Sequence, residues 1–227
     1  GFSVLGCVDA GVDCVKFQLR DMASLYRSGS SESAEEDLGP QYTMNLLAKY
    51  SLTPEQMIGV LDHCKSVDID AFCTPWDEPS LEVLADYGLP ALKIASADLT
   101  NHTLLRACAA KHLPLLVSTG MSTEDEIAAS VSVLQRAGAQ FVLLQCQSTY
   151  PAPYKDVHLR YMDRLAELGE CPVGYSGHER GIHVPIAAVA LGAHVIEKHF
   201  TIDKTLEGND HQVSLLPEEF ADMVARI

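Results

Sequence analysis

The sequence predicts an α/β fold of the (β/α)8 TIM-barrel class, with the first strand apparently absent from this chain. Short apolar runs alternate with amphipathic segments along its whole length. Hydrophobicity within each run is continuous, which is typical of strands buried on both faces of a parallel sheet. From residue 72 onward, the runs recur about every 22 to 31 residues, a spacing that suits one strand and one helix per unit.

Seven runs are candidate strands, and they cover residues 14–18, 71–74, 91–96, 115–118, 141–145, 172–175 and 194–200. The apolar residues Phe2, Val4, Leu5 and Val8 resemble the end of a helix that follows a strand. We therefore expect one domain over residues 1–227 with seven of eight strands. A doubly wound open sheet is the competing architecture. It usually carries an early glycine-rich phosphate turn, and neither that turn nor a P-loop is found here.

Helix signals occupy the gaps between these runs. Capping boxes stand at residues 53–56 and 123–126, the first with proline at the first helical position. The apolar residues that follow predict the buried faces: Ile58, Leu61 and Cys64 after the first box, and Ile127, Val131 and Leu134 after the second. Gly138 is a plausible stop for the second helix, and residues 82–87 before Gly88 and residues 102–110 are also predicted to be helical.

Residues 28–39 (SGSSESAEEDLG) form a polar, acidic segment that interrupts this alternation. A solvated insertion is one interpretation. The other is a mobile loop over an active site.

Composition excludes several classes of function. The 31 acidic residues against 16 basic ones give a net charge of −15, which argues against nucleic acid or an anionic membrane as the main partner. No apolar run approaches the ~18 residues that a membrane span needs. The seven cysteines include no C-x-x-C pair, which makes a zinc ribbon or a redox motif a weak hypothesis. We expect a reducing, cytoplasmic compartment.

In a barrel of this class the active site lies at the carboxyl ends of the strands. Polar residues follow almost every candidate strand: Lys16 and Gln18; Thr74; Lys93, Ser96 and Asp98; Ser118 and Thr119; Gln147, Ser148 and Tyr150; Ser176 and His178; Glu197, Lys198 and His199. This convergence predicts a site at that end of the barrel.

Lys16 and Lys93 lie inside otherwise apolar strands, where a lysine is costly unless it is paired or used. A buried salt bridge is one explanation. An anion site for phosphate or carboxylate, assisted by neighbouring hydroxyls, is another. A Schiff-base lysine is the third.

His178 and His199 end neighbouring strands in this scheme. Adjacent strands lie ~4.8 Å apart, so two imidazoles at the same height can share a metal. Two nitrogen ligands with open positions suit Mn²⁺, Zn²⁺ or Co²⁺ acting as a Lewis acid. Purely structural histidines are the alternative. Asp210 and His211 follow in the next loop and offer a substrate contact.

Several motifs in order resemble the sialic acid synthase (N-acetylneuraminate synthase) family over nearly the whole chain. They are VKFQ (15–18), KIASADLTN (93–101), LVSTGMSTEDEI (116–127), STYPAP (148–153), GYSGHERGI (174–182), AAVALGAHVIEKHFTID (187–203) and GNDHQVSL (208–215). The resemblance implies a transferase that condenses phosphoenolpyruvate with an N-acylated amino sugar to give a nonulosonic acid and phosphate. It also implies C–O cleavage and a divalent metal, commonly Mn²⁺, with Mg²⁺ or Co²⁺ as alternatives.

The resemblance also implies roles for individual residues. His178 and His199 match the metal ligands, and Lys16, Lys93 and Asp98 match catalytic positions. The phosphoenolpyruvate cradle would comprise both lysines with Thr74, Ser96, Ser118 and Ser176, with Ser148 near it. Gln18, Tyr150 and Asp210 match sugar contacts. Three residues depart from the common bacterial pattern: Asp98 stands for glutamate, Ser148 for an asparagine found in some members, and Gly177 for aspartate.

Full-length family members also carry a first strand and a C-terminal antifreeze-like domain, both expected to be absent here, and they form homodimers. N-acetylmannosamine, its 6-phosphate and di-amino sugars all remain candidate substrates. A metal-dependent aldolase or hydrolase on the same barrel, or a fragment that binds without turning over, are the alternative functions.

Overall fold

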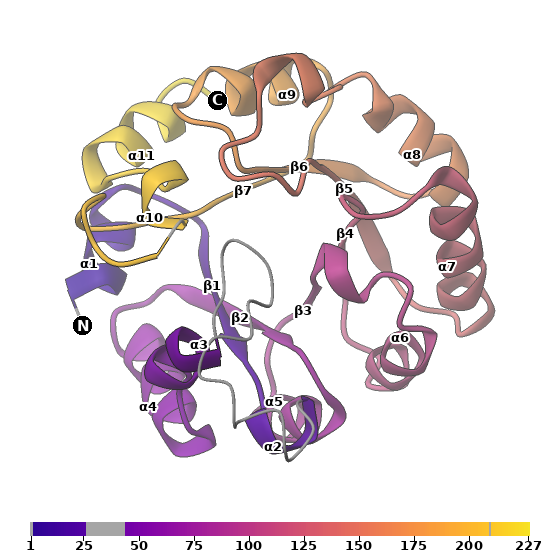
Figure 1. Cartoon of the computed structure of the whole chain (residues 1–227), viewed down its shortest axis with the longest axis horizontal. Coiled ribbons are helices and arrows are strands. Elements are labelled where there is room, and N and C mark those ends of the chain that lie inside the picture. Colours follow the sequence, from indigo (N-terminus) through magenta and orange to yellow (C-terminus); the bar gives the residue numbers. More distant parts are fainter. Residues whose placement is uncertain (1, 26–43, 209) are drawn as a thin grey trace.

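A single parallel sheet organises the chain, in a computed structural model that describes residues 2–25, 44–208 and 210–227. Within those residues the sheet has seven strands in the order β1-β2-β3-β4-β5-β6-β7, so each strand pairs with its neighbour in sequence. The strands are β1 Cys14–Leu19, β2 Asp70–Pro75, β3 Leu92–Ile94, β4 Leu115–Ser118, β5 Phe141–Cys146, β6 Val173–Gly177 and β7 Val195–Lys198. The sheet curls into most of a ring (Figure 1), which confirms a (β/α)8 barrel that is one strand short.

Helices surround the outside of this ring (Figure 1). They are α1 Phe2–Asp9, α2 Met22–Leu25, α3 Met44–Tyr50, α4 Pro54–Ser66, α5 Glu78–Tyr87, α6 His102–Ala109, α7 Glu124–Arg136, α8 Tyr161–Gly169, α9 His183–Ala190, α10 Asp210–Val213 and α11 Pro217–Val224. Short 3-10 turns cover Ser96–Asp98 and Tyr154–Asp156. The predicted insertion at residues 28–39 lies outside the described residues.

Both predicted capping boxes are present. The Thr53 side chain accepts from the backbone N–H of Gln56, and the Gln56 side chain accepts from the N–H of Thr53. Thr123 and Glu126 do the same at the start of α7. The reciprocal bonds satisfy two backbone donors that a helix start otherwise leaves open, which fixes where α4 and α7 begin.

The buried faces follow the predicted pattern, with one correction. Ile127, Val131 and Leu134 are buried in α7 as expected. In α4 the buried residues are Met57, Leu61 and Cys64, and Ile58 is only half-buried. Met57 takes the inward position in place of Ile58, whereas Leu61 and Cys64 are buried as predicted.

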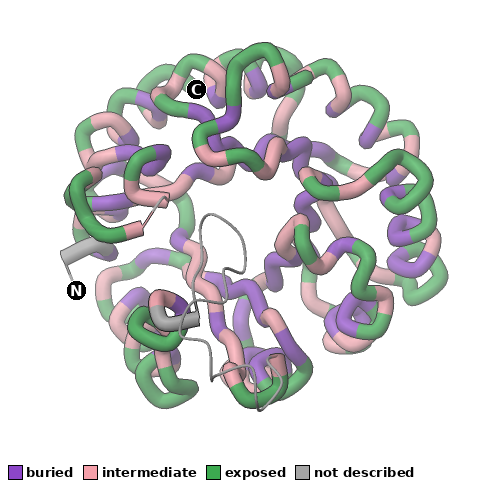
Figure 2. The backbone as a smooth tube through the Cα atoms, in the orientation of Figure 1, coloured by how far each residue is buried: buried purple, intermediate pink, exposed green. Residues whose placement is uncertain are grey.

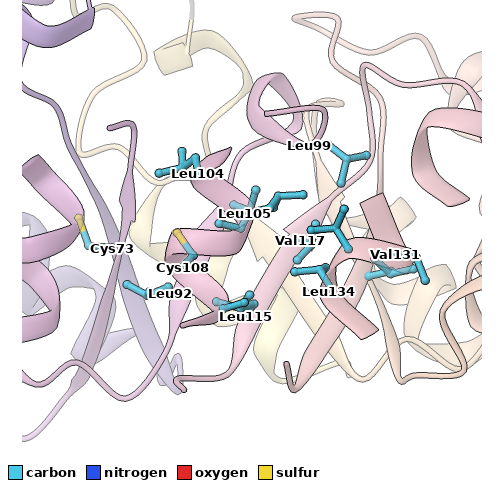
Figure 3. Close-up of a cluster of buried hydrophobic side chains, with 14 of the residues drawn as sticks. Cys73, Leu92, Leu99, Leu104, Leu105, Cys108, Leu115, Val117, Val131 and Leu134 are labelled. Carbon is cyan, nitrogen blue, oxygen red and sulfur yellow. The ribbon is translucent and has the colours of Figure 1, made fainter. Parts of the chain in front are cut away.

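The main core lies between the strands and the inner faces of the helices, where buried stretches of the chain concentrate (Figure 2). Figure 3 shows a part of it in which aliphatic side chains of β3, β4, α6 and α7 pack together, among them Leu92, Leu105, Leu115, Val117 and Leu134. This packing holds the strands rigidly, so the polar residues at their ends are placed by the scaffold.

A smaller cluster closes the ring of helices. Ala10, just after α1, packs with Leu215, Phe220 and Met223 from the last part of the chain. Phe200 contributes to the same cluster and lies close to Gly6 in α1. The first and last helices therefore meet outside the opening between β1 and β7.

Two strands end earlier than predicted. The run 91–96 forms a strand only over Leu92–Ile94, because Ser96 already begins a 3-10 turn. The run 194–200 forms a strand over Val195–Lys198, which leaves His199 just beyond its end. No helix among the described residues is long and apolar enough to cross a lipid bilayer.

Candidate active site

The two strand lysines converge on one carboxylate inside the ring. Lys16 of β1 lies with Nζ 2.8 Å from Oε1 of Glu197 in β7, and Lys93 of β3 lies 3.6 Å from its Oε2. Lys93 also donates a 2.7 Å hydrogen bond to the hydroxyl of Ser118 at the end of β4. Four strands thus contribute to one cluster of charge.

The burial of this cluster sets its protonation. Burial would raise the pKa of Glu197, but the charges of Lys16 and Lys93 outweigh that effect and hold the pKa well below its usual range. Burial lowers the pKa of Lys93, and the negative charge of Glu197 opposes the shift. Two lysines face one carboxylate, so the formal charge of the cluster is +1.

His178 follows β6 and is held by two hydrogen bonds. Its Nδ1 lies 2.7 Å from the carbonyl oxygen of Gln147, and its Nε2 lies 2.7 Å from the hydroxyl of Tyr150. Because a carbonyl can only accept, Nδ1 carries the proton, and Nε2 of the neutral ring accepts from Tyr150. The lone pair of Nε2 therefore points at the Tyr150 hydroxyl, which would have to turn away for this nitrogen to bind a metal.

His199 lies beside His178, and their ring centroids are 5.3 Å apart. The strand register explains the pairing. Ser176 of β6 is opposite Glu197 of β7, and Gly177 is opposite Lys198. One further residue along each chain brings His178 opposite His199. Alternation along the strand also explains why Glu197 and His199 share one face while Lys198 faces the other side.

The chemistry of these two rings fits a divalent metal. Burial lowers the pKa of both histidines, that of His199 to about 4, so both are neutral at pH 7 as metal ligands must be. Nδ1 of His199 lies 3.7 Å from the carboxylate of Asp210, so Nε2 is the ring nitrogen on the side away from Asp210. Among the described residues no cluster of three or more His, Cys, Asp or Glu side chains could hold a metal ion. Two imidazole ligands leave coordination positions open for substrate or water.

Hydroxyl groups complete the floor of the site. Thr74, the last residue but one of β2, is opposite Gln18, and Ser176 of β6 lies between Cys146 and Glu197 in the sheet. Thr74 and Ser176 are both buried. The Ser96 hydroxyl accepts from the backbone N–H of Gly120 at 3.0 Å.

Cys146, at the end of β5, contacts both Ser148 and His178. Its sulfur is 3.9 Å from the Ser148 hydroxyl and 3.7 Å from Nδ1 of His178. Gly120 packs against the same group: a Cβ there would lie 2.6 Å from the Ser148 hydroxyl and 2.8 Å from the carbonyl oxygen of Cys146. Only glycine lets the chain after β4 approach β5 this closely.

A cavity of about 260 Å³ opens at the mouth of the ring, beside β1. Two predicted sugar contacts, Gln18 and Asp210, line it together with Arg20, Tyr50 and His211. The Gln18 side-chain oxygen accepts from Arg20 at 2.8 Å and from Trp76 at 3.1 Å, and the Arg20 guanidinium stacks over the Trp76 ring. The cavity therefore has polar donors and acceptors held in fixed positions.

Asp98 lies apart from the lysine cluster, in the 3-10 turn after β3. Its Oδ1 is 3.5 Å from the amide nitrogen of Asn101, and its Oδ2 is buried without a hydrogen-bond partner among the described residues. Burial raises its pKa, against a smaller opposing effect of Asn101 and Arg20.

Sequence reasoning assigns no role to three contributors: Glu197, Cys146 and Arg20. The sequence marks Glu197 only as a polar strand-end residue, although its spacing of two from His199 indicates that both face the interior. Cys146 gives no such signal, because a cysteine at the end of an apolar run is typical of core. Arg20 follows Gln18 by two residues, and the same alternation would place the two side chains together.

Comparisons with known proteins identify the family of this chain. The NeuB family model matches residues 4–227. N,N'-diacetyllegionaminic acid synthase of Legionella pneumophila is 39% identical over 99% of this chain and 65% of its own length. N-acetylneuraminate-9-phosphate synthase of Homo sapiens is 33% identical over 96% of this chain and 62% of its own. The chain thus spans slightly less than two thirds of the length of these relatives.

A solved structure shares the same architecture. The N-acetylneuraminic acid synthetase of Leptospira borgpetersenii, in complex with citrate, superposes with a TM-score of 0.89 at 34% identity, over 99% of this chain and 75% of that one. The family match over almost every residue, the relatives above 30% identity and the shared barrel together show that this chain belongs to the NeuB family.

Proposed function

We propose that this protein is a transferase that condenses phosphoenolpyruvate with an N-acylated amino sugar, of the N-acetylmannosamine type, to give a nonulosonic (sialic) acid and phosphate. The metal would be a divalent ion, Mn²⁺ first, with Mg²⁺ or Co²⁺ as alternatives. The named relatives are synthases of sialic and legionaminic acids, which supports a reaction of this class. The motif resemblance supports the two substrates.

The observation that carries the proposal is the lysine cluster beside the histidine pair. A formal charge of +1, with the Ser118 hydroxyl already hydrogen-bonded to Lys93, suits a small anion that carries several charges. The Glu197 carboxylate offsets one of the two lysine charges when no substrate is bound, so both lysines have an ionic partner and the site still attracts phosphate.

The cavity next to Gln18 and Asp210 is where we place the sugar. Its volume of about 260 Å³ suits a small molecule, and Gln18, Arg20 and Asp210 in its lining offer polar groups to the hydroxyls of a sugar. Asp210 lies between this cavity and His199, and Tyr150 contacts His178. A sugar in the cavity would therefore have its aldehyde end near the two imidazoles.

In the proposed reaction, Lys16 and Lys93 hold the phosphate of phosphoenolpyruvate, and Thr74, Ser96, Ser118 and Ser176 orient it, with Ser148 alongside. Carbon 3 of phosphoenolpyruvate attacks the open-chain aldehyde carbon, water adds at carbon 2, and phosphate leaves by cleavage of its C–O bond. A metal bound at His178 and His199 would act as a Lewis acid on the aldehyde oxygen. Asp98, whose pKa burial raises, is assigned to proton transfer on the strength of the motif resemblance.

The test is phosphate release from phosphoenolpyruvate with and without Mn²⁺ and with a panel of amino sugars. We expect release only when metal and sugar are both present, and phosphoenolpyruvate labelled with ¹⁸O in the bridging oxygen should yield labelled phosphate. Lys111→Met, at a surface ion pair, is the matched control for Lys93→Met. Turnover without phosphoenolpyruvate would instead indicate an aldolase or hydrolase, and calorimetric binding without product would indicate an inactive fragment.

We also propose a cytoplasmic location and a homodimer. The seven cysteines are all free, which suits a reducing compartment. Sedimentation equilibrium of the purified protein tests the dimer.

A further inference from the structure

A second charged cluster lies directly behind the histidine pair, on the other side of the sheet. Glu179 accepts a 2.5 Å hydrogen bond from the Tyr175 hydroxyl at Oε2, and Lys198 Nζ lies 3.0 Å from its Oε1. Lys198 also donates to the backbone carbonyl of Glu179 at 2.5 Å. The Glu179 and Lys198 side chains have no solvent exposure.

This cluster faces away from the proposed chemistry. Lys198 alternates with Glu197 along β7, so it points to the opposite side from the lysine site. Its acceptors recorded in the structure both belong to Glu179, one of them a main-chain atom. The recorded contacts of Glu179 and Lys198 therefore include no residue of the lysine site or of the sugar cavity.

A buried ion pair is a poor source of stability, because desolvation of both charges offsets their attraction. Its better documented effect is to fix one arrangement among several. In this protein the ion pair would fix the positions of the two histidines, because Glu179 directly follows His178 and Lys198 directly precedes His199. The ion pair thus joins β6 and β7 at the two residues next to the imidazoles.

Gly177 shows how closely the Glu179 carboxylate packs against β6. It is opposite Lys198 in the register, and the Glu179 carboxylate folds back over it. A Cβ at residue 177 would lie 2.6 Å from Oε2 and 2.9 Å from Oε1 of Glu179, and 2.7 Å from Cε1 of Tyr175. The absence of a side chain at residue 177 is what lets Glu179 reach both of its partners.

We propose that Glu179, held by Lys198 and Tyr175, is a positioning residue that sets the separation and orientation of His178 and His199 and thereby tunes their affinity for a divalent metal. The inference rests on the proposed metal role of the two histidines. Residues that orient metal ligands without touching the metal typically change its affinity by about 10–100-fold when mutated.

The test uses Mn²⁺ alone as the probe, with dissociation constants from calorimetry and from the loss of the free Mn²⁺ EPR signal. Tyr175→Phe removes one hydroxyl and keeps the ring, and Glu179→Gln keeps the shape and removes the charge. We expect both to weaken Mn²⁺ binding by about 10–100-fold. Phosphoenolpyruvate binding measured without metal should be unchanged.

Two comparisons separate positioning from stability. Ile127→Val, a core change in α7 remote from the cluster, is the matched control: it should lower the melting temperature and leave the Mn²⁺ dissociation constant unchanged. Where Glu179→Gln alone unfolds, the double variant Glu179→Gln/Lys198→Met removes both charges, and we expect it to fold and to bind Mn²⁺ weakly. Variants that lose melting temperature but keep wild-type Mn²⁺ affinity would overturn the proposal.

Failure of the proposed function gives a different result, because the wild-type protein would then not bind Mn²⁺. Crystal structures of the wild type and of Tyr175→Phe would decide the positioning role in that case. A changed separation of the imidazoles, 5.3 Å between ring centroids in the wild type, supports the proposal. An unchanged separation contradicts it.

Discussion

Lys16 and Glu197 form a 2.8 Å ion pair across the opening between β1 and β7, the two edge strands of the sheet. The same carboxylate reaches Lys93 of β3. One acidic side chain therefore links the first, third and last strands and ties the two edges of the curled sheet together at the level of the candidate site.

Removing that carboxylate should change both stability and anion binding. Glu197→Gln leaves two inward-facing lysines without a counter-charge, and breaking a buried ion pair costs about 3–5 kcal/mol. Because the uncompensated site is more positive, inorganic phosphate should raise the melting temperature of Glu197→Gln more than that of the wild type. Thermal unfolding with and without phosphate measures both effects.

The double variant Lys16→Met/Glu197→Gln is the control, since it restores the charge balance. It should recover part of the lost stability and lose the enhanced response to phosphate. An equal phosphate response in all three proteins would show that the cluster does not attract anions.

The two lysines should contribute unequally to phosphoenolpyruvate binding. Lys93 is almost fully buried and already hydrogen-bonded to Ser118, so water cannot replace it, whereas Lys16 keeps 19% of its side chain exposed. Losing one preorganised donor of this kind typically lowers kcat by about 100–1,000-fold. Lys93→Met should show that loss in kcat/KM and Lys16→Met a smaller one, measured by steady-state kinetics of phosphate release. Equal effects would contradict the unequal burial.

The strands and the convergence of their ends could be predicted because each depends on local pattern. Continuous apolar runs and capping boxes define β1 to β7 and the starts of α4 and α7, and parallel strands in sequence order bring Lys16, Lys93, His178 and His199 to one end. Contacts between distant strands carry no such pattern. The link from Glu197 to both lysines depends on how far the sheet curls, and sequence order alone does not define that curvature.

The ends of the strands were predicted less well, because they too depend on contacts between residues that are distant in sequence. The run 91–96 is apolar throughout apart from Lys93 and Ser96, yet Ser96 begins a 3-10 turn, and its hydroxyl accepts from the N–H of Gly120. A contact with a loop that is distant in sequence accompanies that boundary, and no local pattern marks it. The burial of Met57 instead of Ile58 in α4 is likewise set by the surface against which the helix packs.

Two glycines should respond to the same substitution in opposite directions. In β6, a Cβ on Gly174 would meet the carbonyl oxygen of Val195 and lie 2.7 Å from a methyl carbon of Leu144. Overpacking of this kind costs about 1–3 kcal/mol, so Gly174→Ala should lower the free energy of unfolding by that amount. Gly59 lies inside α4, where a Cβ would meet no neighbour within 4 Å, so Gly59→Ala should stabilise by about 0.5–1 kcal/mol. Urea unfolding of both variants checks the pair, and a loss of stability in Gly59→Ala would refute the argument.

Buried thiols should make the fold sensitive to alkaline pH. Burial raises the pKa of Cys73 and of Cys108 from 9.0 to about 12, with smaller effects of nearby charges. Between those values the unfolded chain releases protons that the folded chain keeps. The contribution of each thiol to the free energy of unfolding is therefore complete below about pH 9 and is lost as the pH rises toward 12, with a slope of up to about 1.4 kcal/mol per pH unit.

Urea unfolding from pH 8 to 11 should show a shallower decline of the free energy of unfolding in Cys108→Ala than in the wild type, whatever the cost of the substitution at pH 8. Lysine and tyrosine titrations are common to both proteins and cancel in the difference, so identical slopes would mean that the Cys108 thiol does not hold its proton as its burial requires.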